Sequence, residues 1–173
     1  RDYFETGRGS IRVQAKTGPN KEDQTWSQPN FTFFATQQGV VKKTALEEFS
    51  NIRKGGIIAI KIEEGDLLID VRMTSGHDEV ILITHGGMSI RFKEEDARPM
   101  GRPASGVQGM RLRGDDEVIE VDIADDSAEL LVVTENGWGK RTRVSDSPVK
   151  GRGGLGVQTA KLVEGKGKLA GAR

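Results

Sequence analysis

Short hydrophobic runs separated by polar, glycine-containing turns fill residues 31 to 173. The first two runs, 31–36 and 40–44, flank the turn Gln38-Gly39, which is the pattern of a β-hairpin. Apolar residues at helical spacing are confined to a short stretch at 45–49. The pattern therefore predicts an all-β protein built from short strands.

The same pattern recurs about every fifty residues. Gly56, Gly106 and Gly156 are spaced by fifty positions, and the turns Gly86-Gly87 and Asn136-Gly137 repeat the first turn. Each unit on its own would expose an apolar face, so neighbouring units must stack to bury it. Repeats of this kind predict a bladed, propeller-like β-architecture. The expected strands are 31–36, 40–44, 57–62 and 67–71, then 79–84, 88–93, 107–112 and 117–123, then 129–134, 138–143, 157–162 and a last piece near Leu169.

Two regions with different patterns are expected. Residues 1–30 contain an alternating stretch at 10–16, typical of a half-buried strand, and polar linker material at 17–24. The remainder is expected to form an incomplete disc in which Trp138 packs between blades. Its four-stranded blades are predicted at about 31–74, 79–123 and 129–173.

Composition restricts the possible functions. The 173 residues include 26 Lys and Arg and 26 Asp and Glu, so the net charge is zero. Any binding to a polyanion must therefore come from charge segregation on the surface. The chain has no cysteine, which excludes disulfides and thiolate zinc sites. No apolar run approaches the ~18 residues of a membrane helix, so no membrane contact is expected.

A cation occupies the same place in each hairpin. Lys43, Arg91 and Arg141 each follow the second turn residue by four positions. We expect such a row to place positive charge on one rim of the disc, where it can contact phosphates. The alternative is that charged residues protect strand edges from aggregation. Three further basic residues in the same strands are candidates for the rim: Lys42, Lys140 and Arg143.

The long loops carry a second set of cations, Arg53, Lys54, Arg98, Arg102, Lys150 and Arg152. Neighbouring glycines let backbone N–H groups approach a phosphate, and guanidinium groups bind its oxygens in pairs. A solvated loop with turn glycines is the alternative interpretation. The acidic turns at 63–66, 115–117 and 125–126 are expected on a different edge as solvated turns, and their spacing gives no metal site.

Several stretches resemble a known family, the carboxy-terminal domain of the DNA gyrase A subunit, with the similar tail of topoisomerase IV as near neighbour. The resemblance is carried by 38–44, 75–80, 98–102 and 134–142. It implies a β-pinwheel that binds and bends double-stranded DNA around a basic outer rim. For the parent enzyme it implies two partners, a second A subunit plus the gyrase B subunit. A cytoplasmic, nucleoid-associated location and no cofactor are implied as well.

Two further features bear on this resemblance. Residues 3–13 resemble a segment of the breakage-reunion region, but Tyr3, the sole tyrosine, does not match the catalytic one, so no strand cleavage is expected. The family's glycine-rich box is matched in part by Lys150-Gly151-Arg152-Gly153-Gly154-Leu155-Gly156. Arg152, Gly153, Gly154 and Gly156 match, while Lys150, Gly151 and Leu155 depart. The departures put chiral wrapping, rather than DNA binding, in question.

The sequence therefore predicts a sequence-independent binder of double-stranded DNA, because it contains no recognition helix or groove-reading ribbon. The alternative function is a propeller-type protein-interaction module without a nucleic-acid role. Binding to DNA should weaken steeply with salt, whereas the alternative predicts scattered cations and binding to a protein partner that is insensitive to salt.

Overall fold

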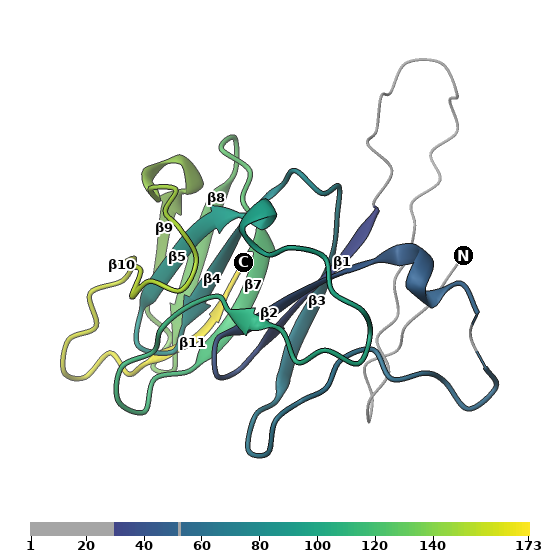
Figure 1. Cartoon of the computed structure of the whole chain (residues 1–173). Helices are drawn as coiled ribbons and strands as arrows, with labels where there is room; N and C mark the ends of the chain where they lie inside the picture. Colours follow the sequence, from purple (N-terminus) through teal and green to yellow (C-terminus); the bar gives the residue numbers. More distant parts are fainter. Residues whose placement is uncertain (1–29, 52) are drawn as a thin grey trace.

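The computed structural model describes residues 30–51 and 53–173, which form strands, turns and short 3-10 helices (Figure 1). The strands are β1 (Phe31–Thr36), β2 (Val40–Ala45), β3 (Leu68–Thr74), β4 (Glu79–Thr84), β5 (Met88–Lys93), β6 (Val107–Gln108), β7 (Val118–Ile123), β8 (Glu129–Thr134), β9 (Gly139–Arg143), β10 (Val157–Gln158) and β11 (Leu169–Ala172). The 3-10 helices η1 (Leu46–Phe49), η2 (Glu94–Asp96) and η3 (Val144–Asp146) follow β2, β5 and β9. The all-β prediction is confirmed. The strand and linker expected in residues 1–30 lie outside the described residues, except for Asn30.

The blades exchange strands along the chain. The strand order is β3-β1-β2-β6 in the first sheet, β10-β5-β4-β7 in the second and β11-β8-β9 in the third. The short strands β6 and β10 therefore come from the repeat that follows the blade they complete. Val41 pairs with Val107 in the first blade, and Ser89 pairs with Val157 in the second. The expectation that each repeat keeps its four strands in its own blade is wrong in this respect.

Strand exchange explains where the expected strands differ from those observed. The stretch 57–62 is extended in pattern but forms no strand, because no preceding blade among the described residues offers it an edge. Its counterparts in the next two repeats form strands only over the two residues of β6 and β10 that reach the preceding blade. The third blade has three strands in the described part of the chain, since β9 receives no fourth.

The hydrophobic core lies between blades rather than inside each one. Phe33 and Phe92 are fully buried and lie in one apolar cluster shared by the first and second blades, with ring centroids 6.3 Å apart. A second cluster joins Ile83 of the second blade to Val132 and Leu169 of the third. Packing of each apolar face against its neighbour is what makes a stack of repeats stable.

The strand order defines an inner and an outer side. β3 packs against β7, and β7 packs against β11, so these strands lie on the inner side where the blades meet. β6 and β10 lie at the opposite, outer edge of the first and second sheets, and β9 is the outer strand of the third. Within the described residues, no helix is long and apolar enough to cross a membrane.

Trp138 does not pack between blades. Its side chain is 57% exposed at the tip of the third hairpin, and the Lys166 ammonium lies 4.9 Å from its ring centroid. The corresponding residues of the other two hairpins, Val40 and Met88, are half-buried beside β6 and β10. The tryptophan is exposed because its strand edge lacks such a neighbour among the described residues.

Candidate nucleic-acid interface

Long loops cover the outer edges of the first two blades. After η2 the chain runs parallel to β2, where Pro99 pairs with Lys43 and the Met100 N–H donates to the Lys43 carbonyl over 2.8 Å. After η3 the chain repeats this course beside β5, and the Lys150 N–H donates to the Arg91 carbonyl over 2.8 Å. These loops form the outer surface together with β9, which has no such loop beside it in the described part of the chain.

The strand cations of the first two blades lie beneath these loops. The exposed fractions of Lys42, Lys43 and Arg91 are 0%, 3% and 6%. The Lys42 ammonium donates to the carbonyls of Ala59 and Arg102, over 2.6 Å in each case. Burial, with help from the neighbouring Arg102 cation, lowers the pKa of Lys42 to about 8. These side chains are therefore covered and cannot meet a phosphate on the outer surface.

Lys43 and Arg91 instead connect adjacent blades. The Lys43 ammonium lies 3.8 Å from a carboxylate oxygen of Glu94, which is fully buried in η2 of the second blade. The Arg91 guanidinium binds Glu79 of its own blade at 2.6 Å. It also reaches the chain of the third blade, at 2.7 Å from Asp126 and 3.1 Å from the Val144 carbonyl. The shared position of Lys43 and Arg91 in their hairpins thus reflects a repeated contact between blades.

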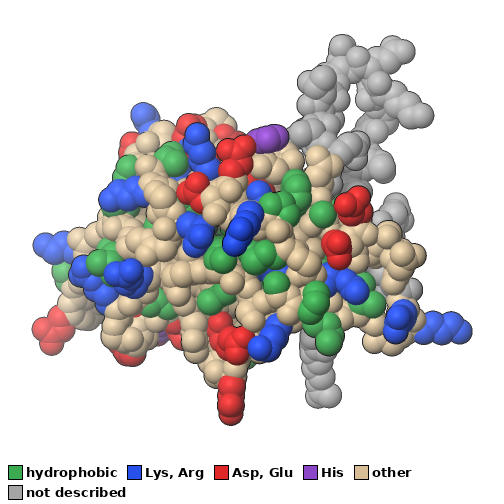
Figure 2. Space-filling model, in the orientation of Figure 1, with side chains coloured by type: hydrophobic (Ala, Val, Ile, Leu, Met, Phe, Trp, Pro, Cys, Tyr) green, Lys and Arg blue, Asp and Glu red, His purple; other side chains and the backbone are tan. Residues whose placement is uncertain are grey.

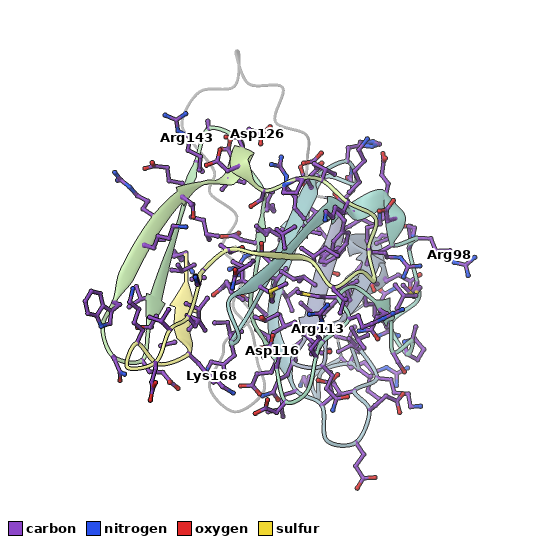
Figure 3. All side chains as sticks on the ribbon, turned by 90° about the vertical axis from the view of Figure 1, so that its left-hand side faces the viewer. Arg98, Arg113, Asp116, Asp126, Arg143 and Lys168 are labelled. Carbon is purple, nitrogen blue, oxygen red and sulfur yellow. The ribbon has the colours of Figure 1, made fainter. Side chains whose placement is uncertain are left out.

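The third blade presents its cations to solvent. Arg141 is 70% exposed and its guanidinium lies 3.0 Å from the Glu129 carboxylate of the same hairpin. Lys140 and Arg143, on the same strand, are also exposed. Figure 3 shows the Arg143 side chain extending away from the ribbon near Asp126.

The loop cations are mostly accessible. Arg53, Lys54, Arg98 and Lys150 are exposed, and Arg102 is half-buried. Figure 3 shows Arg98 projecting outward on a different side of the molecule from Arg143. Arg152 is half-buried, and its guanidinium donates to the Asp96 carbonyl over 2.8 Å and to the Gln108 carbonyl over 3.0 Å.

The glycine-rich box at 150–156 forms backbone hydrogen bonds with residues of the second repeat. Gly153 has a φ of 79°, and its N–H donates to the Gly109 carbonyl over 2.6 Å. The Gly154 carbonyl accepts from the Arg111 N–H over 2.8 Å. These contacts fix the loop against the donated segment of the second repeat. Its side chains, rather than these two peptide groups, are left to face a ligand.

Two aspartates expected in solvated turns are structural. The Asp66 carboxylate is buried and accepts from the Gln38 N–H over 2.9 Å at the tip of the first hairpin. Asp116 accepts from the Gly86 N–H and from the Thr84 hydroxyl at the second tip. Only the fifty-residue spacing of these aspartates could have indicated this shared capping role. No cluster of acidic or histidine side chains among the described residues could hold a metal ion.

Acidic side chains also gather on the inner strands. Arg72 of β3 binds Asp70 on its own strand, Glu120 at 3.0 Å and Asp122 at 3.1 Å on β7. Burial is the main cause that raises the pKa of Glu120. Segregation is incomplete, since Figure 3 shows Asp126 near the exposed Arg143, and Figure 2 shows acidic and basic groups interspersed on one face. Several basic side chains nevertheless group at the edge of that face where Figure 1 places β9 and β10.

A known protein family matches most of this chain. A model of the DNA gyrase C-terminal domain, a beta-propeller, matches residues 31–75, 78–125 and 128–173. The chain belongs to this family. The DNA gyrase A subunit of Klebsiella oxytoca is 55% identical over 80 residues, which make up 46% of this chain and 9% of that protein. The DNA gyrase A subunit of Halalkalibacterium halodurans is 48% identical over 87 residues, 50% of this chain and 10% of that protein.

Solved structures support the same fold. The C-terminal domain of DNA topoisomerase IV superposes with a TM-score of 0.81 at 24% identity, over 99% of this chain and 52% of that chain. A DNA gyrase A C-terminal domain gives a TM-score of 0.75 at 26% identity, over 90% of this chain and 51% of that chain. The resemblance predicted from the sequence motifs is confirmed. The chain spans about half of each solved domain, and the matched segments span about a tenth of the gyrase proteins.

Proposed function

We propose that this chain binds double-stranded DNA through its exposed outer cations, without reading the base sequence. Seven of these outer cations, Arg53, Lys54, Arg98, Lys140, Arg141, Arg143 and Lys150, are exposed, and two more, Arg102 and Arg152, are half-buried. Membership of the DNA gyrase C-terminal domain family supports the ligand class. The observation that carries the proposal is the exposure of seven of these nine side chains on the outer loops and β9, while the inner strands hold the Arg72 ion cluster.

The chemistry of the surface fits phosphate rather than bases. Guanidinium and ammonium groups bind phosphate oxygens, and such contacts position a duplex without carrying sequence information. The described part of the chain has no helix that could enter a major groove, since η1, η2 and η3 are single short turns. Lys42, Lys43 and Arg91 do not belong to the proposed interface because other parts of the protein cover them.

Binding should depend steeply on salt. Each phosphate that is neutralised lowers the logarithm of affinity by about 0.9 per logarithmic unit of salt. Titrations of a fluorescent duplex at several salt concentrations should therefore give a straight line of negative slope for binding, with the same affinity for unrelated sequences. Absence of binding at low salt, or a flat line, would remove the proposal.

Charge removal tests the surface itself. The double variant Arg98→Gln and Arg143→Gln should weaken binding and reduce the salt slope by roughly 2, about 0.9 for each lost contact. The matched control is Lys61→Gln with Lys168→Gln, which removes two exposed cations paired with Glu63 and Asp115 in turns. Figure 3 places Lys168 at the far end of the third blade from Arg143. Equal losses in both double variants would mean that the outer surface has no special role.

We propose further that this chain is the DNA-bending part of a type II topoisomerase A subunit. The similar proteins are DNA gyrase A subunits. The proposed partners are therefore a second A subunit and the gyrase B subunit. Bending a duplex over a short site costs on the order of 1–6 kcal/mol, so contacts must extend along the curved edge. The chain is not proposed to cleave DNA. A purified chain that leaves supercoiled plasmid uncut while retarding it in a gel would meet both expectations.

A further inference from the structure

Two complementary strand-pairing surfaces have no partner strand within residues 30–51 and 53–173, and they lie on opposite sides of the molecule. On one side is the outer edge of β9, which lacks the strand that β2 receives from β6 and β5 receives from β10. On the other side is the segment 56–60, which is the counterpart of β6 and β10 in the first repeat. Figure 1 shows β9 at the left and the stretch that follows η1 at the right.

The acceptor edge retains its geometry without an occupant among the described residues. Gly39, Gly87 and Gly137 share a φ near 80°, with values of 79°, 81° and 78°. A Cβ on Gly39 or Gly87 would lie 2.6 Å from a carbonyl oxygen of the donated segment, whereas nothing lies within 4 Å at Gly137. The carbonyls of Gly39 and Gly87 each accept two N–H groups from that segment. The Gly137 carbonyl has no such partner within the described ranges.

The donor segment 56–60 likewise already has the backbone conformation of its counterparts at its first residue. Gly56, Gly106 and Gly156 have positive φ values of 77°, 113° and 74°. A Cβ added to Gly106 would collide with the Val41 carbonyl oxygen, and a Cβ added to Gly156 would collide with the Ser89 carbonyl oxygen. A Cβ added to Gly56 would have no atom within 4 Å. The end of the segment is fixed by the Lys61 N–H, which donates to the Ala104 carbonyl. The Arg111 N–H donates in the same way to the Gly154 carbonyl in the next repeat.

The repeated register identifies which residues would meet. Val40 pairs with Gln108 and Met88 with Gln158, so the repeat places Trp138 opposite Ile58. Both are among the most exposed large apolar side chains described, at 57% and 72%. Pairing would bury both, which is favourable by roughly 25 cal/mol for each Å² removed from water.

Charge complementarity favours the same arrangement. Arg91 reaches the Val144 carbonyl at the start of η3 in the next blade. The corresponding contact of Arg141 would be the carbonyl of Leu46, at the start of η1. The following residues, Glu47 and Glu48, are exposed and acidic, whereas β9 carries exposed cations.

From these features we propose that two copies of this chain associate head to tail, with residues 56–60 of each copy added to the β9 edge of the other. The N–H groups of Ala59 and Ile60 would donate to the Gly137 carbonyl, as those of Gly109 and Met110 do to Gly39. The described residues of each copy offer one donor and one acceptor, so two copies can close into a ring with two identical contacts. Such a ring would hold twice a chain that spans 51% of the gyrase A domain structure.

Light scattering after size exclusion tests the association with the intact chain. We expect a concentration-dependent species of twice the 18.9 kDa chain mass. Gly137→Asn and Gly56→Asn should each abolish it, because the added side chain occupies the position of the partner's backbone. Asparagine tolerates positive φ, so the fold should persist. Gly114→Asn is the matched control, with a φ of 58° and nothing within 4 Å, and should leave the dimer intact.

Disulfide trapping tests the register. The chain has no cysteine, so Ile58→Cys and Trp138→Cys introduce the only thiols. Under air oxidation, a mixture of the two single variants should give a crosslinked dimer, while either variant alone should not. A monomer at all concentrations, a dimer that survives both glycine substitutions, or crosslinking of one variant with itself would overturn the proposal. Each of these outcomes is measured without DNA. In the dimer Lys140 and Arg141 would be covered as Lys42 and Arg91 are, so Arg143 and the loop cations would remain for DNA.

Discussion

At the scale of single residues, burial decides the role of a cation more than its place in the repeat. Lys43, Arg91 and Arg141 occupy equivalent positions, yet the first two are covered by the following repeat and the third is exposed. Covered cations need partners that replace water. Glu94 and the carboxylates around Arg91 provide these partners. The same residue type therefore joins blades at two positions and is available to a ligand at the third.

Lys42 should make stability depend on pH. Its pKa is about 8 in the folded chain, below the ordinary 10.5 of the unfolded chain. Between these values the unfolded chain binds more protons, so the free energy of unfolding should rise with pH. In Lys42→Met this contribution is absent. Urea unfolding at pH 7 to 10.5 should show the wild type gaining stability relative to the variant above pH 8. A constant difference over that range would contradict the assigned burial effect.

A pair of glycine substitutions separates backbone strain from steric overlap. Gly87→Ala and Gly137→Ala share a positive φ, which costs an L-residue roughly 1–2 kcal/mol. Only at Gly87 does the new Cβ meet a carbonyl oxygen, that of Ala160 at 2.6 Å. Gly87→Ala should therefore lose a further 1–3 kcal/mol or so of unfolding free energy. The measurement is chemical denaturation at concentrations too low for association. Equal losses of unfolding free energy would mean that the backbone at Ala160 moves away from the new Cβ without loss of stability.

At the scale of elements, local pattern and long-range pairing are separable. The hairpins β1–β2, β4–β5 and β8–β9 were predictable because alternation and a glycine turn are local signals. The exchange of β6 and β10 was not, because a strand's apolar pattern does not specify which blade provides its edge. Alternation likewise places Lys42 and Lys43 on opposite faces, but it cannot reveal that a loop from the next repeat covers both. The outer loop cations were predicted from composition and glycine spacing alone, and their contact with DNA stays a prediction.

The contact between blades can be tested with matched arginines. Arg91→Met removes bonds to Glu79, Asp126 and the Val144 carbonyl, so it should lower the unfolding free energy by about 1–3 kcal/mol. Arg141→Met removes one exposed pair with Glu129 and should cost less than about 1 kcal/mol in the dilute chain. Urea unfolding checks both. Similar losses would show that the contact to the third blade adds nothing.

At the scale of the whole molecule, zero net charge and an affinity for a polyanion are compatible. The inner strands hold Asp70, Glu120 and Asp122 around Arg72, while exposed cations lie on the outer loops and β9. Fields fall off within about 8 Å at physiological salt, so a ligand on the outside senses mainly the nearest charges. The order of strands from inside to outside, rather than the total charge, determines what the surface can attract.

Strand exchange has a consequence for how such proteins change length during evolution. An inserted repeat would complete the sheet before it and present an edge like β9 to the sheet after it. A gene duplication of about fifty codons thus adds a blade without requiring a new type of contact. Blade number can vary among descendants while every junction stays the same.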